Sequence, residues 1–96
     1  MANVQVTYLG ANRYRLVGEP THPEWQKGRR VGLEPWCEIT VHGNYLGSYG
    51  GEMWPSAWPE YFEALPASVQ AGRGGFKLTE AGATLLRTAP YGEVQR

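Results

Sequence analysis

The sequence predicts an α+β fold: two antiparallel β-hairpins form a small sheet, and one or two short helices pack on one of its faces. Three observations predict this class. Residues 4–18 and 35–51 each alternate apolar and polar side chains around a short turn, as strands with one buried face do. Thirteen glycines and seven prolines in 96 residues favour short elements. Residues 80–87 are rich in helix formers and follow a threonine suited to an N-cap.

The first hairpin is expected over residues 4–18. Its turn is Gly-Ala-Asn at residues 10–12, where asparagine tolerates the left-handed backbone that such a loop needs. A three-residue turn at this point places Val6 opposite Leu16 and Tyr8 opposite Tyr14. One face of the hairpin is then apolar and the other polar.

The second hairpin is expected over residues 35–51, with Gly43-Asn44 as a two-residue turn. That turn pairs Val41 with Leu46 on the inner face. Its register assigns the other face of the hairpin to five polar or aromatic side chains: Trp36, Glu38, His42, Tyr45 and Tyr49. A three-residue turn would reverse the faces of the second strand.

Residues 19–32 carry two prolines, two glycines and five charges without periodicity. We expect a long surface loop that holds Trp25. Further along, a proline follows Trp54, so we expect Trp54 to be extended and partly exposed. A helix is expected from an N-cap at Ser56 to about residue 65, because one helical face would then bury Trp58, Phe62 and Leu65.

The last segment allows two readings. Thr79 could cap a helix over residues 80–87, or residues 76–79 and 83–88 could pair as strands. Helix propensity favours the first reading. The chain is expected to be one domain over residues 1–96 with a loose tail from about residue 90, since its length suits a single modest core.

Composition narrows the classes of function. Nine basic and nine acidic residues give a net charge of zero, whereas a generic phosphate binder usually carries a basic excess. Cys37 is the only cysteine, so no internal disulfide can form and nothing indicates an oxidising compartment. The N-terminus lacks the pattern of a signal peptide, and no apolar run approaches the length of a membrane span. We therefore expect a cytoplasmic protein that makes no contact with membranes.

Candidate catalytic and metal-binding groups are few. Cys37 and His42 are five residues apart on one expected strand, so their side chains project to opposite faces. The two histidines and the cysteine match no familiar zinc spacing. We expect no catalytic residue, no metal and no cofactor, and hence a protein that is not an enzyme.

Aromatic residues carry the functional prediction. Twelve of them exceed what one small core can hide fully, and Trp, Tyr and Arg dominate interface hot spots. The chain is expected to be a small non-catalytic protein-binding module, for example a phage or mobile-element accessory protein or an inhibitor of a host macromolecule. The residues expected to contact the partner are Trp54, Trp36, Tyr45, Tyr49, Trp25, Arg29 and Arg30.

The alternative is a nucleic-acid-binding regulator that uses an arginine-rich loop. Arg29 and Arg30, together with Arg13 and Arg15, could form a basic patch. Trp25 and Trp36 would lie nearby for base stacking. The sequence leaves the identity of the partner and the oligomeric state open.

Overall fold

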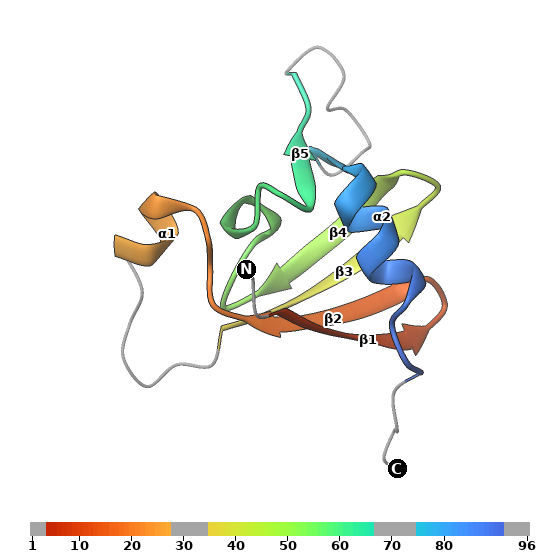
Figure 1. Ribbon diagram of the computed structural model, residues 1–96. Helices are drawn as coiled ribbons and strands as arrows, with labels where there is room; N and C mark the ends of the chain where they lie inside the picture. Colours follow the sequence, from red (N-terminus) through yellow and green to blue (C-terminus); the bar gives the residue numbers. More distant parts are fainter. Residues whose placement is uncertain (1–3, 28–34, 67–74, 92–96) are drawn as a thin grey trace.

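A computed structural model describes residues 4–27, 35–66 and 75–91. These residues form a six-stranded antiparallel sheet with short helices beside it (Figure 1). The strands are β1 Val4–Gly10, β2 Arg13–Gly18, β3 Trp36–His42, β4 Tyr45–Gly51, β5 Phe62–Ala64 and β6 Phe76–Leu78, in the spatial order β1-β2-β3-β4-β6-β5. The helices are α1 Pro23–Lys27, the 3₁₀ turn η1 Pro55–Ala57, and α2 Glu80–Arg87. The α+β class is confirmed in outline, but the sheet has more strands than two hairpins supply.

The β1–β2 hairpin has the expected register. Val6 lies opposite Leu16 and Tyr8 opposite Tyr14, and the two tyrosine rings are 5.0 Å apart. Asn12 adopts the left-handed backbone that the turn requires, with φ of 64°. The apolar face of this hairpin therefore points into the core, as the alternation predicts.

The β3–β4 hairpin also forms, and Val41 pairs with Leu46 around the Gly43-Asn44 turn. The register then shifts, because Thr40 lies opposite Ser48 and leaves Gly47 as an extra residue in a β-bulge. A side chain at Gly47 would collide with the ring of His42, so glycine fits this bulge. The bulge moves Tyr49 to the inner face, opposite Ile39. The prediction that Tyr49 lies on the outer face is wrong for this reason.

The helix expected over residues 56–65 does not form. The chain makes only the short turn η1, bends again, and then extends as β5, which pairs with β6. Trp58 has φ of −129° and ψ of 74°, outside the helical region, because Pro59 disfavours the helical conformation in the residue before it. Trp54 is extended, as predicted. The three apolar residues assigned to the helical face are buried nonetheless: Trp58, Phe62 and Leu65.

Helix α2 settles the ambiguity in the last segment. Thr79 caps it, since its hydroxyl accepts a hydrogen bond from the backbone N–H of Gly82 at 3.0 Å. The same hydroxyl donates to the carbonyl of Glu60 at 2.6 Å. A side chain at Gly82 would collide with the backbone carbonyl of Tyr61. Close backbone approach between the first turn of α2 and residues 60–61 therefore depends on this glycine.

The surface loop expected over residues 19–32 is described as far as residue 27, and residues 19–27 are attached to residues 54–60. Residues 28–32 lie outside the described part of the chain. The backbone N–H groups of Thr21 and His22 both donate to the carbonyl of Ala57, at 2.9 and 3.1 Å. The indole N–H of Trp58 donates to the carbonyl of Glu19 at 2.9 Å. Within this segment the short helix α1 presents Trp25, which packs against the core.

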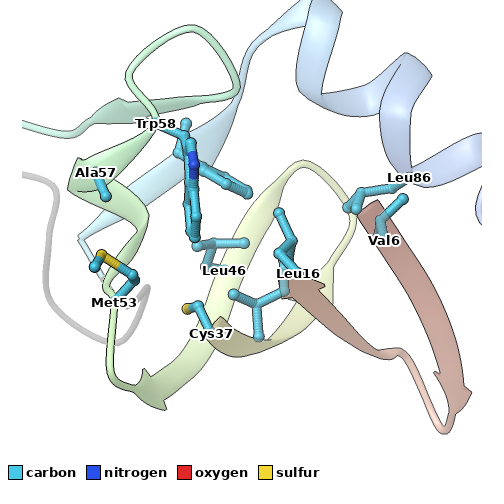
Figure 2. Close-up of a cluster of buried hydrophobic side chains, with 10 residues drawn as sticks. Val6, Leu16, Cys37, Leu46, Met53, Ala57, Trp58 and Leu86 are labelled. Atoms are coloured by element: carbon cyan, nitrogen blue, oxygen red, sulfur yellow. The ribbon is translucent and has the colours of Figure 1, made fainter. Parts of the chain in front are cut away.

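The core lies between the inner face of the sheet, helix α2 and the η1 segment. Trp58 stands over the sheet near Leu46, while Leu86 of α2 approaches Val6 at the opposite end of the core (Figure 2). The remaining buried members are Leu16, Cys37, Ile39, Met53, Ala57 and Phe62. Among the described residues, no helix is long and apolar enough to cross a bilayer.

The chain after α2 contacts the outer edge of β1 at Tyr8. The backbone N–H of Tyr8 donates to the carbonyl of Pro90 at 2.8 Å, and Tyr91 forms a parallel bridge with Tyr8. The attachment thus extends at least one residue past the point where a loose tail was expected. Residues 92–96 lie outside the described part of the chain.

Candidate partner-binding surface

Four aromatic rings form a continuous row, which we call the aromatic surface: Trp25, Trp54, Tyr49 and Phe76. Their ring centroids are separated by 6.3 Å from Trp25 to Trp54, 5.9 Å from Trp54 to Tyr49, and 5.5 Å from Tyr49 to Phe76. The rings come from α1, the chain after β4, β4 itself and β6. Tilted and edge-on contacts at these distances are favourable for aromatic pairs.

Trp54 is the exposed centre of this row. Its side chain is 51% accessible, whereas Trp58, four residues later, is fully buried. The adjacent Pro55 is buried, and the carbonyl of Trp54 accepts a hydrogen bond from the N–H of Ala57 at 2.9 Å. An exposed indole is therefore mounted on a fixed backbone, so that little conformational freedom remains to be lost on binding.

Trp25 is held against Trp54 by a polar contact. Its indole N–H donates to the hydroxyl of Ser56 at 2.9 Å. The side-chain amide of Gln26 donates to the carbonyl of Pro20 at 3.1 Å, which braces α1. These contacts fix the position of Trp25 at one end of the aromatic surface.

Two predicted partner residues lie elsewhere. Trp36 and Tyr45 are on the outer face of the sheet, opposite Val17 and His42 respectively. The Arg15 guanidinium lies 4.3 Å above the Trp36 ring and forms an ion pair with Glu38 at 3.1 Å. This cation–π contact covers part of the Trp36 ring. Because Trp36 and Tyr45 lie on the outer face of the sheet, whereas Tyr49 lies on the inner face, neither residue is part of the aromatic surface.

The outer face also carries the described part of the predicted basic patch. Arg13 and Arg15 both lie there, and Arg13 lines a shallow hollow of about 300 Å³ over β3 and β4. Arg15 is already paired with Glu38, and the hydroxyls of Thr40 and Ser48 bond each other at 3.1 Å. Arg29 and Arg30 lie outside the described residues, so the patch as a whole is not seen.

The nucleophile candidate Cys37 is in the core. It has no exposed surface, and burial raises the pKa of its thiol to about 12. The thiolate, which is the reactive form, is therefore strongly disfavoured at neutral pH. His42 is exposed at the far end of the same strand. Within residues 4–27, 35–66 and 75–91, no three side chains are grouped as metal ligands.

Sequence reasoning missed Phe76 and Ser56. Phe76 completes the row only because β6 inserts beside β4, and that pairing leaves no local signal in the sequence. Ser56 was interpreted as a helix cap, and its hydroxyl instead fixes Trp25. Tyr49 was predicted to contact the partner, but on the outer face of the hairpin, whereas it lies on the inner face opposite Ile39.

Comparisons with protein-family models, with curated proteins and with solved structures find no match to this chain.

Proposed function

We propose that the protein is a small non-catalytic protein-binding module that docks on its partner through the aromatic surface. One observation carries the proposal: Trp54 is half exposed at the centre of a row of four rings. Exposed indoles on rigid supports are typical hot spots of protein interfaces. Such a module would act by occupying a surface on another macromolecule, as a phage accessory protein or an inhibitor does, with no bond made or broken.

The aromatic neighbours of Trp54 support this proposal. Trp25 and Tyr49 flank the ring and lie partly buried against the core. Burial of a large aromatic side chain at an interface removes about 150–250 Å² of surface from water. Trp54 is 51% exposed, so roughly 80–130 Å² of that area is left to bury, which at about 25 cal/mol per Å² corresponds to about 2–3 kcal/mol before the costs of association. A single anchor of this kind can therefore determine whether a complex forms.

The experiment compares wild-type protein with Trp54→Ala as immobilised baits in a lysate, with bound proteins quantified by mass spectrometry. Tyr91→Ala is the matched control, because Tyr91 is the other large exposed hydrophobic side chain among the described residues, at 69%, and lies outside the aromatic surface. The proposal requires a protein that binds wild type and Tyr91→Ala but is lost from Trp54→Ala. Retention of every bound protein by Trp54→Ala would contradict it.

The second candidate function is nucleic-acid binding. Arg13 and Arg15 on the open outer face, with Trp36 beneath Arg15, favour it. Binding that neutralises phosphates weakens steeply with salt, whereas aromatic docking does not. Titration with single-stranded and duplex DNA or RNA at low and high salt separates the two. No binding at low salt would eliminate this candidate.

A further inference from the structure

Strand β1 is an edge strand to which the chain after α2 is hydrogen-bonded at Tyr8. Its seven residues, Val4–Gly10, read VQVTYLG and include no charged residue and no proline. Natural proteins commonly place lysine, proline or an inward-pointing charge on such an edge, because its unpaired backbone groups accept another strand. Among the strands that the structure describes, only β2 pairs with β1 within the sheet.

The outward direction of one N–H group shows which backbone groups of β1 point away from β2. The N–H of Tyr8 donates to the carbonyl of Pro90, so Tyr8 points its backbone groups toward the outer edge. Because these directions alternate along a strand, Val6 and Val4 also direct their N–H and C=O groups outward. The register from Val4 to Tyr8 is unbroken. Among the described residues, these groups of Val4 and Val6 have no partner.

We propose that this edge pairs with the same edge of a second copy of the chain, antiparallel, about a two-fold axis through Gln5. Val4 then lies opposite Val6 of the second copy, and Val6 opposite its Val4. Residues paired in this way exchange N–H···O bonds in both directions. The two Gln5 residues face each other as a non-hydrogen-bonded pair, and the two sheets become continuous.

A second copy fits this edge for three reasons. The unpaired stretch is limited on one side by Pro90 and Tyr91, which contact β1 at Tyr8. The short remainder around Gln5 can pair with the same stretch of a second copy, as a two-fold interface requires. The chain has zero net charge, so two copies do not repel each other. Valine then faces valine on the core side of the joined sheet, a favourable cross-strand pair.

The first test measures molar mass by light scattering and sedimentation over a wide range of concentration. Wild type is expected to rise from 10.7 kDa toward twice that mass. Gln5→Lys and Gln5→Glu place like charges at the axis and are each expected to stay monomeric, while their equimolar mixture dimerises. Gln5 is exposed, so neither change disturbs the core. Ala81→Lys adds the same charge on the exposed side of α2 and should leave the dimer intact.

The second test fixes the register by cross-linking. In a non-hydrogen-bonded pair the Cα atoms are about 4.5 Å apart, within the range of roughly 4.4–6.8 Å that a disulfide spans. Gln5→Cys is therefore expected to form a covalent dimer under mild oxidation, and Thr7→Cys is not. The native Cys37 does not compete, because it is buried in the core.

Three results would overturn the proposal. The first is a wild-type mass that stays at 10.7 kDa at every concentration. The second is a dimer that Gln5→Lys leaves unchanged, which would locate the interface elsewhere. The third is equal cross-linking of Gln5→Cys and Thr7→Cys, which would exclude the register. None of these outcomes depends on the aromatic surface, so failure here leaves the proposed function standing.

Discussion

The indole N–H of Trp25 donates to the hydroxyl of Ser56 across 31 residues of sequence, at 2.9 Å. This bond joins α1 to η1 and sets Trp25 beside Trp54. The two tryptophans of the aromatic surface thus share one support, and changes in that support should alter both stability and binding.

The first prediction concerns removal of the Ser56 hydroxyl. Ser56→Ala leaves the half-buried indole N–H of Trp25 without its acceptor, so we expect a loss of about 1 kcal/mol in the free energy of unfolding. Cleavage by trypsin after Lys27, at the end of α1, should become faster. Chemical denaturation and timed proteolysis measure the two effects. Ser48→Ala, which removes an exposed hydroxyl on β4, is the control and should change neither.

The second prediction concerns Trp58, which is fully buried and bonded to the carbonyl of Glu19. Trp58→Ala should cost about 3–5 kcal/mol, because it leaves a large cavity in a small core. Trp58→Phe retains most of the volume and should cost less. Thermal denaturation of both variants decides this, and a small loss for Trp58→Ala would mean that the core closes around the gap.

Trp54→Ala should behave in the opposite way. Its ring contacts Trp25 and Tyr49 but is half exposed, so we expect a stability loss of only about 1 kcal/mol. Partner affinity should fall by about 2 kcal/mol or more if Trp54 is a hot spot. Denaturation and a binding titration with the captured partner measure the two quantities separately. A stability loss equal to that of Trp58→Ala would make Trp54 part of the core.

Gly82→Ala is predicted to destabilise the protein although alanine is the better helix former by about 1 kcal/mol. The added methyl group would collide with the carbonyl of Tyr61, which approaches closely at the start of α2. The exposed neighbour Ala81 provides the control, since Ala81→Gly should lose only the propensity difference. A Gly82→Ala variant more stable than wild type would show that the backbones separate at no cost.

The raised pKa of the Cys37 thiol predicts that the free energy of unfolding decreases at high pH. Its pKa is raised from 9.0 to about 12 in the folded protein, so the unfolded chain loses this proton first. Stability is therefore complete below pH 9 and falls as pH rises toward 12, by up to about 1.4 kcal/mol per pH unit. Cys37→Ser should flatten this slope in denaturation measured across that range. An unchanged slope in the variant would assign it to other groups.

The two hairpins could be predicted because their information is local. Alternation and turn residues fix the β1–β2 register, including the left-handed Asn12. The face of Tyr49 could not be predicted, because one extra residue at Gly47 reverses every side chain after it. That bulge is visible in the sequence only as one more glycine in a strand that has three.

In the segment after β4, the buried residues could be predicted from the sequence but the backbone conformation could not. Helical spacing correctly selected Trp58 and Phe62 as buried, yet the backbone there is a turn followed by a strand. Pairing with β6 decides the conformation of β5, and tertiary pairing overrides local propensity. Exposure of Trp54 could be predicted because Pro55 acts locally. The assembly of Trp25, Tyr49 and Phe76 around it could not, because it depends on contacts between distant elements.

The strand order has a consequence for how the chain reaches its native state. β5 precedes β6 in sequence but lies outside it in the sheet, so β5 has no strand to join until β6 has arrived beside β4. The β4–β6 junction is a single paired position, Tyr45 with Lys77. The β1–β4 meander can therefore assemble first from near neighbours, and the β5–β6 pair closes over Trp58 last. In native-state hydrogen exchange, amides of β5 and β6 should open together, well before those of β2 and β3.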